Sequence, residues 1–135
     1  MKKYLYNSLY VIIGLIVIGL AAYKLYFSKQ SSIGITADKF EDISKEPGCV
    51  IIDIRNASDF KGDKLSGAQN ISFTAGDFKE RVQSLDKKKT YLLYCKNGND
   101  ALYAARTMKE MGFDRVYSLK GGLDGWKREN KPVVK

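Results

Sequence analysis

The sequence contains no histidine and only two cysteines among its 135 residues. Without histidine, the chain has neither His-based acid–base catalysis nor a His metal ligand. Two cysteines are too few for a disulfide scaffold or for a four-thiolate metal site, and we expect no metal and no cofactor. A nucleophile in this chain therefore has to be activated by backbone dipoles, by a lysine or by an arginine.

The positive charge is shared between two dissimilar regions. The first thirty residues contain four lysines and no acidic residue, and they account for half of the net charge of +8. The rest of the chain holds all 15 acidic residues and 19 of the 23 basic ones, which is the balance of an ordinary solvated surface. Because this part has no arginine-rich stripe, we expect no binding of nucleic acid.

An uncharged run of 20 residues, from Tyr4 to Tyr23, lies near the N-terminus. Such a run is long enough to cross a hydrocarbon core of about 30 Å as a helix. Aromatic rings occur at both of its ends, as at the two interfaces of a membrane, and they belong to Tyr4, Tyr6, Tyr10, Tyr23, Tyr26 and Phe27. We therefore predict that residues 1–30 form a signal anchor, held in the membrane by residues 4–27, and that the protein is a single-pass protein of the cell membrane.

A cleaved signal peptide is the alternative interpretation of this segment. Lys2 and Lys3 fit its charged start, and the small residues Ala21 and Ala22 fit a cleavage site. The lysines on the two sides of the apolar run are nearly balanced, and the slight excess at the N-terminus favours a globular domain outside the cytoplasm.

The periodicity beyond the apolar run predicts one α/β domain over residues 31–135. A polar tether at 28–34 is followed by alternating patterns of helix and strand. The expected strands are 49–54, 70–73, 90–94 and 115–119, and the expected helices are 36–44, 78–85, one ending near 111 and a last one with Leu123 and Trp126. Such alternation predicts βαβ units and a mainly parallel sheet with helices on both faces.

The candidate reactive residue is Cys95, at the carboxyl end of the strand predicted at 90–94. Ligands of open parallel sheets bind at this edge, and a tight turn into a helix directs backbone N–H groups to one place. We expect a thiol held there to be partly thiolate near neutral pH. The anion cradle is predicted to consist of Lys96, Asn97, Gly98, Asn99, Asp100 and Ala101. The alternative is that Cys95 is only a small apolar residue that ends a buried strand.

Cys49 opens its predicted strand and is therefore expected at the opposite edge of the sheet. Five residues of strand separate the two edges by about 15 Å, which is too far for a disulfide. We predict that Cys49 is a core thiol.

Four short motifs, in this order and spacing, resemble those of the rhodanese-like (sulfurtransferase) family. They are Ile52-Asp53-Ile54-Arg55 with Asp59-Phe60, Ser66-Gly67-Ala68-Gln69-Asn70-Ile71, Tyr94-Cys95-Lys96-Asn97-Gly98, and Leu119-Lys120-Gly121-Gly122 with Trp126. The resemblance extends from about Ile35 to Val134. It implies a three-layer fold with a sheet of about five strands, and a cysteine that carries sulfur as a persulfide.

The roles of the residues agree with that chemistry. Cys95 would take sulfane sulfur from thiosulfate or from a persulfide and pass it to a thiol or cyanide acceptor. Asp53 and Arg55, at the carboxyl end of the neighbouring strand, would pair and brace the site. A purely structural salt bridge is the alternative for this pair.

The cysteine loop departs from the pattern Cys-x-x-Gly-x-Arg-Ser that active members often show. Asp100 stands at the arginine position and Ala101 at the serine position. An aspartate there repels an anionic donor and favours the neutral thiol, although it is also a suitable N-cap for the following helix. Lys96 restores part of the positive potential, as a flexible point charge.

Two other functions are considered, the first because of this departure and the second because a related fold supports phosphatase chemistry. The first is a weakly active or inactive rhodanese-like module that docks an unknown protein partner at the membrane. The second is a phosphatase with Cys-x5-Arg chemistry, which we discount because Ala101 stands where that arginine is required.

Overall fold

The computed structural model describes residues 1–135, apart from the side chains of residues 29–31. The chain divides into two compact units, residues 1–32 and 33–135. The first unit is one long helix, α1 (Lys2–Ser31). The helix continues through the first half of the predicted tether, so that prediction is wrong there. The reason is that residues 28–31 contain neither proline nor glycine to end the helix.

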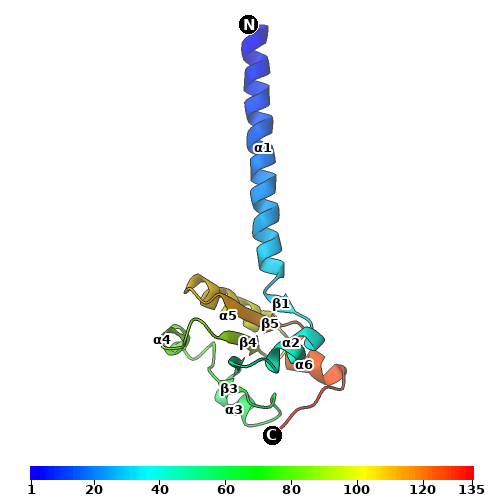
Figure 1. Cartoon of the computed structure of the whole chain (residues 1–135), viewed down its shortest axis with the longest axis vertical. Helices are drawn as coiled ribbons and strands as arrows, with labels where there is room; N and C mark the ends of the chain where they lie inside the picture. The colour runs from blue at the N-terminus through cyan, green and yellow to red at the C-terminus, as the bar shows by residue number, and fades with distance from the viewer. The chain divides into compact units, whose positions relative to one another are not determined.

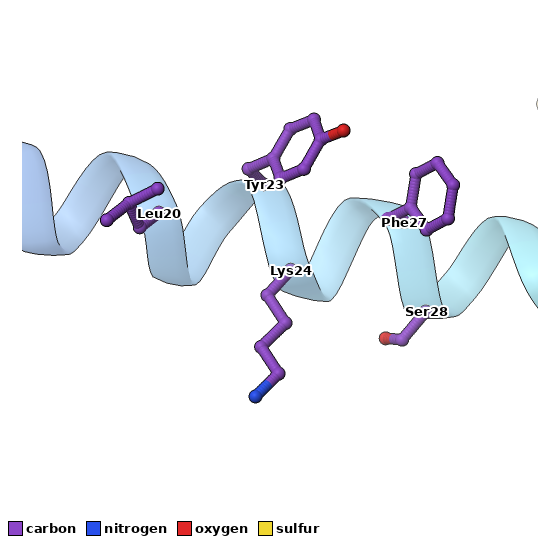
Figure 2. Close-up of a pocket in the computed structure, with 5 residues that line it drawn as sticks. All are labelled: Leu20, Tyr23, Lys24, Phe27 and Ser28. Atoms are coloured by element: carbon purple, nitrogen blue, oxygen red, sulfur yellow. The ribbon is translucent and has the colours of Figure 1, made fainter.

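Residues 2–28 of α1 are long and apolar enough to cross a membrane, and none of the apolar stretch is buried within the protein. A signal sequence near an N-terminus has the same properties. At the C-terminal end of this stretch the rings of Tyr23 and Phe27 stack, with centroids 5.9 Å apart. Figure 2 shows these rings on one side of the helix and the side chains of Lys24 and Ser28 on the other.

The second unit is built around a five-stranded sheet in the order β1-β5-β4-β2-β3. Figure 1 labels four of these strands, namely β1, β5, β4 and β3. All of its strand pairs are parallel. The strands are β1 (Gly34–Ile35), β2 (Cys49–Asp53), β3 (Gln69–Asn70), β4 (Thr90–Tyr94) and β5 (Arg115–Leu119). The predicted fold class is therefore confirmed, with two differences at the sheet edges. β1 lies where the tether was expected, and β3 is shorter than the predicted strand 70–73, since an edge strand has a neighbour on one side only.

Helices cover both faces of the sheet. They are α2 (Ala37–Ser44), α3 (Ala57–Phe60), α4 (Phe78–Gln83), α5 (Asn99–Glu110) and α6 (Gly122–Arg128). One hydrophobic core lies between the sheet and α4 with α5, and a second lies between the sheet and α2 with α6. The N-terminus of α2 is capped as predicted, because the Thr36 side chain accepts the N–H of Lys39 at 3.4 Å.

The alternation of side chains along β4 decides on which face of the sheet Cys95 lies. Successive residues of a strand point to opposite faces. Tyr91, Leu93 and Cys95 belong to the core beneath α4 and α5, whereas Leu92 and Tyr94 belong to the core beneath α2 and α6. The sulfur of Cys95 is therefore on the α5 side of the sheet.

Candidate active site

The sulfur of Cys95 accepts backbone hydrogen bonds from the loop that follows it. The Sγ atom lies 3.1 Å from the nitrogen of Gly98 and 3.4 Å from the nitrogen of Ala101. The thiol lies 3.9 Å from Oδ1 of Asn97, to which it donates. Cys95 is buried, with 4% of its surface exposed. The loop thus wraps its N–H groups around one sulfur atom.

The turn into α5 depends on Gly98. This residue has φ 97° and is the N-cap of α5. A Cβ at this position would lie 2.9 Å from the nitrogen of Gly121 and 3.1 Å from the carbonyl oxygen of Leu119. Glycine is therefore required both for the left-handed backbone and for the close approach of the next loop.

The prediction that Asp100 caps α5 is wrong. The left-handed turn at Gly98 starts the helix at Asn99, so Asp100 is the second helical residue and has no capping geometry. The N–H of Ala101, at the third helical position, donates instead to the sulfur of Cys95. In this helix the sulfur occupies the place of the oxygen in an ordinary N-cap, at the positive end of the helix dipole.

The other residues of the predicted cradle contribute in different ways. Oδ1 of Asn97 accepts the N–H of Asn99 at 3.1 Å and so holds the turn. The side chains of Lys96, Asn99 and Asp100 are exposed, whereas Ala101 is fully buried. The structure therefore brings backbone N–H groups, rather than charged side chains, to the sulfur.

Asp53 and Arg55 form a tight ion pair close to this edge of the sheet. Nη2 of Arg55 lies 2.6 Å from Oδ2 of Asp53, and Nε lies 3.0 Å from Oδ1. Asp53 is fully buried and is the ladder partner of Tyr94, so its side chain is on the face opposite the sulfur. Burial, followed by the nearby Asp53 carboxylate, raises the pKa of Tyr94.

The ion pair ties several segments together from that face. Nη2 of Arg55 also donates to the carbonyl oxygen of Asp63 at 2.9 Å, and the guanidinium lies 5.8 Å from the ring centroid of Tyr94. The Asn70 side chain donates to the carbonyl oxygens of Asp53 and Arg55 at 2.9 and 2.8 Å. The ion pair thus holds the segment at Asp63, and the Asn70 side chain joins the ends of β2 and β3; none of the contacts that the structure describes joins the pair to the sulfur.

The first turn of α6, which follows the turn after β5, packs directly on the cysteine loop. The N–H of Leu123 donates to the carbonyl oxygen of Cys95 at 2.8 Å, and the N–H of Asp124 donates to that of Lys96 at 3.0 Å. In the sequence, Gly121 and Gly122 were noted only as part of the motif Leu119-Lys120-Gly121-Gly122. Two adjacent glycines before a helix also signal a close backbone approach, and that signal is the one that sequence reasoning missed.

Cys49 lies at the amino end of β2, where the sequence placed it, and both cysteines are free thiols. Cys49 is partly buried, and burial, followed by the charge of Glu46, raises its pKa. Among the residues that the structure describes, no group of three or more His, Cys, Asp or Glu side chains is placed to hold a metal ion.

A protein-family model described as the rhodanese-like domain matches residues 36–129. The chain belongs to the rhodanese-like domain family. It is 34% identical over 76 residues to the uncharacterized protein YqhL of Bacillus subtilis, a match that covers 56% of this chain and only 59% of that protein.

Two further relatives are a named enzyme and a protein whose crystal structure is known. The chain is 31% identical over 86 residues to the thiosulfate sulfurtransferase GlpE of Coxiella burnetii, covering 64% of this chain and 78% of that enzyme. A crystal structure of a protein from Bacillus halodurans superposes with a TM-score of 0.65 at 31% identity, and covers 86% of this chain and 85% of that one. The family thus includes sulfurtransferases that are related to this chain.

Proposed function

We propose that this rhodanese-like protein is a membrane-anchored sulfurtransferase that carries sulfane sulfur as a persulfide on Cys95. The observation that carries the proposal is the pair of N–H groups, from Gly98 and Ala101, directed at the Cys95 sulfur. Donors fixed in advance around one atom stabilise an anion formed there without reorganisation. A cysteine that served only to pack the end of a strand would not need this arrangement.

The proposed reaction has two steps. In the first, the Cys95 thiolate attacks the outer sulfur of thiosulfate, a sulfur–sulfur bond forms, and the sulfur–sulfur bond of thiosulfate breaks to release sulfite. In the second, cyanide or a thiolate attacks the outer sulfur of the persulfide and restores the Cys95 thiolate. A small persulfide or a protein persulfide replaces thiosulfate as donor by the same displacement, with its thiolate as leaving group.

The electrostatics of the loop favour a donor with little negative charge. Asp100 is exposed in the first turn of α5, at the mouth of the cradle, where it opposes a doubly charged anion. Lys96 is also exposed and offsets part of this repulsion. We therefore propose a persulfide as the more effective donor and thiosulfate as the poorer one.

The second candidate function is a docking module with little or no activity. The observation in its favour is again Asp100, which replaces a cation that active relatives often have at this position. In such a module Cys95 would serve packing alone, and its replacement would leave binding of the partner unchanged.

The proposed location of the protein in the membrane rests on the properties of α1. Its apolar length, the absence of internal burial and the aromatic rings at both ends support a retained anchor more than a cleaved signal sequence. We propose that the globular unit faces the extracytoplasmic side. Intact mass of the membrane-extracted chain tests retention of α1, and alkaline phosphatase fused to the C-terminus tests the side, since that enzyme is inactive in the cytoplasm.

Intact mass spectrometry tests the chemistry directly. The full-length protein in detergent is incubated with thiosulfate or with a small persulfide, beside Cys95→Ala and the matched control Cys49→Ala. We expect one added sulfur atom in the wild type and in Cys49→Ala, lost on treatment with cyanide, and none in Cys95→Ala. Absence of added sulfur in folded wild type with both donors would favour the docking module.

A further inference from the structure

We infer that the first turn of α6 is a positioning element of the active site, and that Gly122 is the residue on which it depends. This inference rests on the proposed function and concerns the part of the cradle that meets the second sulfur. Gly98 and Ala101 donate to Sγ itself, so a sulfur bonded to Sγ needs further donors from the same loop.

The peptide planes of the loop supply these donors. The carbonyl oxygens of Cys95 and Lys96 are held by the N–H groups of Leu123 and Asp124, at 2.8 and 3.0 Å. In a planar trans peptide the N–H points away from the carbonyl oxygen of the same unit. The N–H groups of Lys96 and Asn97, which share these two peptides, therefore point away from α6.

The Cys95 sulfur lies on the side of the cysteine loop that faces away from α6. Cys95 belongs to the core on the α5 side of the sheet, and α6 contributes Leu123 and Trp126 to the core on the other side. α6 holds the two carbonyl oxygens by hydrogen bonds. It thereby directs the N–H groups of the same two peptides, those of Lys96 and Asn97, towards the face of the sheet on which a persulfide extends. The α6 turn thus sets the orientation of the cradle without contacting the sulfur.

Glycine at position 122 leaves the room that these two hydrogen bonds require. Its φ is 58°, and a Cβ there would lie 2.6 Å from the carbonyl oxygen of Cys95 and 2.5 Å from that of Lys96. These are the same two oxygens that α6 holds. Any side chain at this position has to push the cysteine loop away from α6, because the nearest atoms belong to the backbone of that loop and not to flexible side-chain ends.

The far end of α6 is fixed as well. Nε1 of Trp126 donates to the carbonyl oxygen of Pro132 at 2.8 Å. Nζ of Lys131 binds Asp38 and Glu41 on α2 at 2.8 and 2.6 Å. Because α6 is anchored at its C-terminal side, a side chain at position 122 would displace the cysteine loop and not the helix.

Three glycine variants of the full-length protein in detergent test the inference. Gly122→Ala places a methyl group against the two loop oxygens. Gly121→Ala imposes the same left-handed strain, at φ 76°, but its Cβ comes no closer than 3.4 Å to any atom. Gly125→Ala has its nearest neighbour at 3.6 Å and controls for an added methyl group in α6. The rate of Cys95 persulfide formation is measured at a temperature at which all three are folded.

We expect Gly122→Ala to lower this rate by about tenfold to a hundredfold, which is less than the roughly hundredfold to thousandfold loss when one preorganised donor is removed, because the donors are displaced and not removed. We expect the other two variants to stay within about threefold of the wild type. Hydrogen exchange of the peptide spanning residues 95–102 provides a readout independent of sulfur. Its protection should fall in Gly122→Ala and not in Gly121→Ala.

The outcomes separate this inference from the proposed function. If the wild type takes up no sulfur, the proposed function fails and the exchange data alone decide the role of Gly122. Wild-type rates and exchange in Gly122→Ala, or equal losses in Gly121→Ala, would overturn the inference. If Gly122→Ala does not fold, Asp124→Pro is tested in its place. It removes one of the two N–H donors in the first turn of α6, where proline is tolerated. The rate of persulfide formation and the hydrogen exchange of residues 95–102 in this variant then decide the inference.

Discussion

Asp53 is the ladder partner of Tyr94, the residue before Cys95, and its carboxylate lies on the opposite face of the sheet from the Cys95 sulfur. The ion pair of Asp53 with Arg55 is therefore next to the site in the chain but separated from it by the sheet. We expect the pair to act on stability more than on chemistry.

Arg55→Met should be strongly destabilising, because it leaves the fully buried Asp53 carboxylate without its cation. Removal of one partner of a buried pair costs roughly 3–5 kcal/mol. The double variant Asp53→Asn/Arg55→Met should be more stable than the single one, since no unpaired charge remains. Denaturant unfolding measures both, and a single variant as stable as the wild type would contradict the structural role.

Gly98→Ala should impair both folding and sulfur transfer. The left-handed backbone alone costs about 1–2 kcal/mol for alanine, and the Cβ also meets the backbone of Gly121 at 2.9 Å. Gly67→Ala is the matched control, because Gly67 has φ 76° and no neighbouring atom within 4 Å. The melting temperature and the rate of persulfide formation should both be lower for Gly98→Ala than for Gly67→Ala. Equal values in the two variants would mean that the contact with Gly121 is unimportant.

Asp100→Asn should increase the rate with thiosulfate, by about two- to fivefold, because it removes a negative charge from the mouth of the loop. Two exposed charges a few Å apart interact by about 1 kcal/mol in water. The gain should disappear at about 1 M salt, where the screening length is about 3 Å. Glu110→Gln, at the other end of α5, controls for net charge. An unchanged rate would show that Asp100 does not weaken the reaction with thiosulfate.

The ion cluster around Lys131 should contribute to acid sensitivity. The hydrogen bond from Lys131 lowers the pKa of Glu41 below its ordinary value of 4.5. A carboxyl whose pKa is lower in the folded state stabilises the fold above its unfolded pKa, and this contribution is lost as the pH falls through the folded pKa. Glu41→Gln should therefore be less stable than the wild type at pH 7, and the difference should shrink below about pH 4.5. Melting temperatures across this range measure it, and a constant difference would contradict the linkage.

Much of this architecture could be predicted from local patterns. The β-branched run of β2 and the alternation of strands with amphipathic helices defined the parallel α/β fold. The position of Cys95 after a buried strand indicated the edge of the sheet that carries the candidate site. The patterns failed at the shortest elements, β1 and β3, because a two-residue strand has almost no periodicity and is formed only by its neighbour in the sheet.

The sequence by itself determined the fold class, the family, the apolar N-terminal helix and the cysteine that carries the proposed chemistry. Only the tertiary structure decided what surrounds that cysteine. The sulfur of Cys95, not the Asp100 side chain, accepts an N–H of the first turn of α5, because the left-handed Gly98 starts the helix at Asn99, two residues before the start that a cap at Asp100 would give. The glycines of the β5–α6 turn contact the cysteine loop through backbone atoms, and such contacts between distant segments depend on packing that no local pattern of side chains encodes.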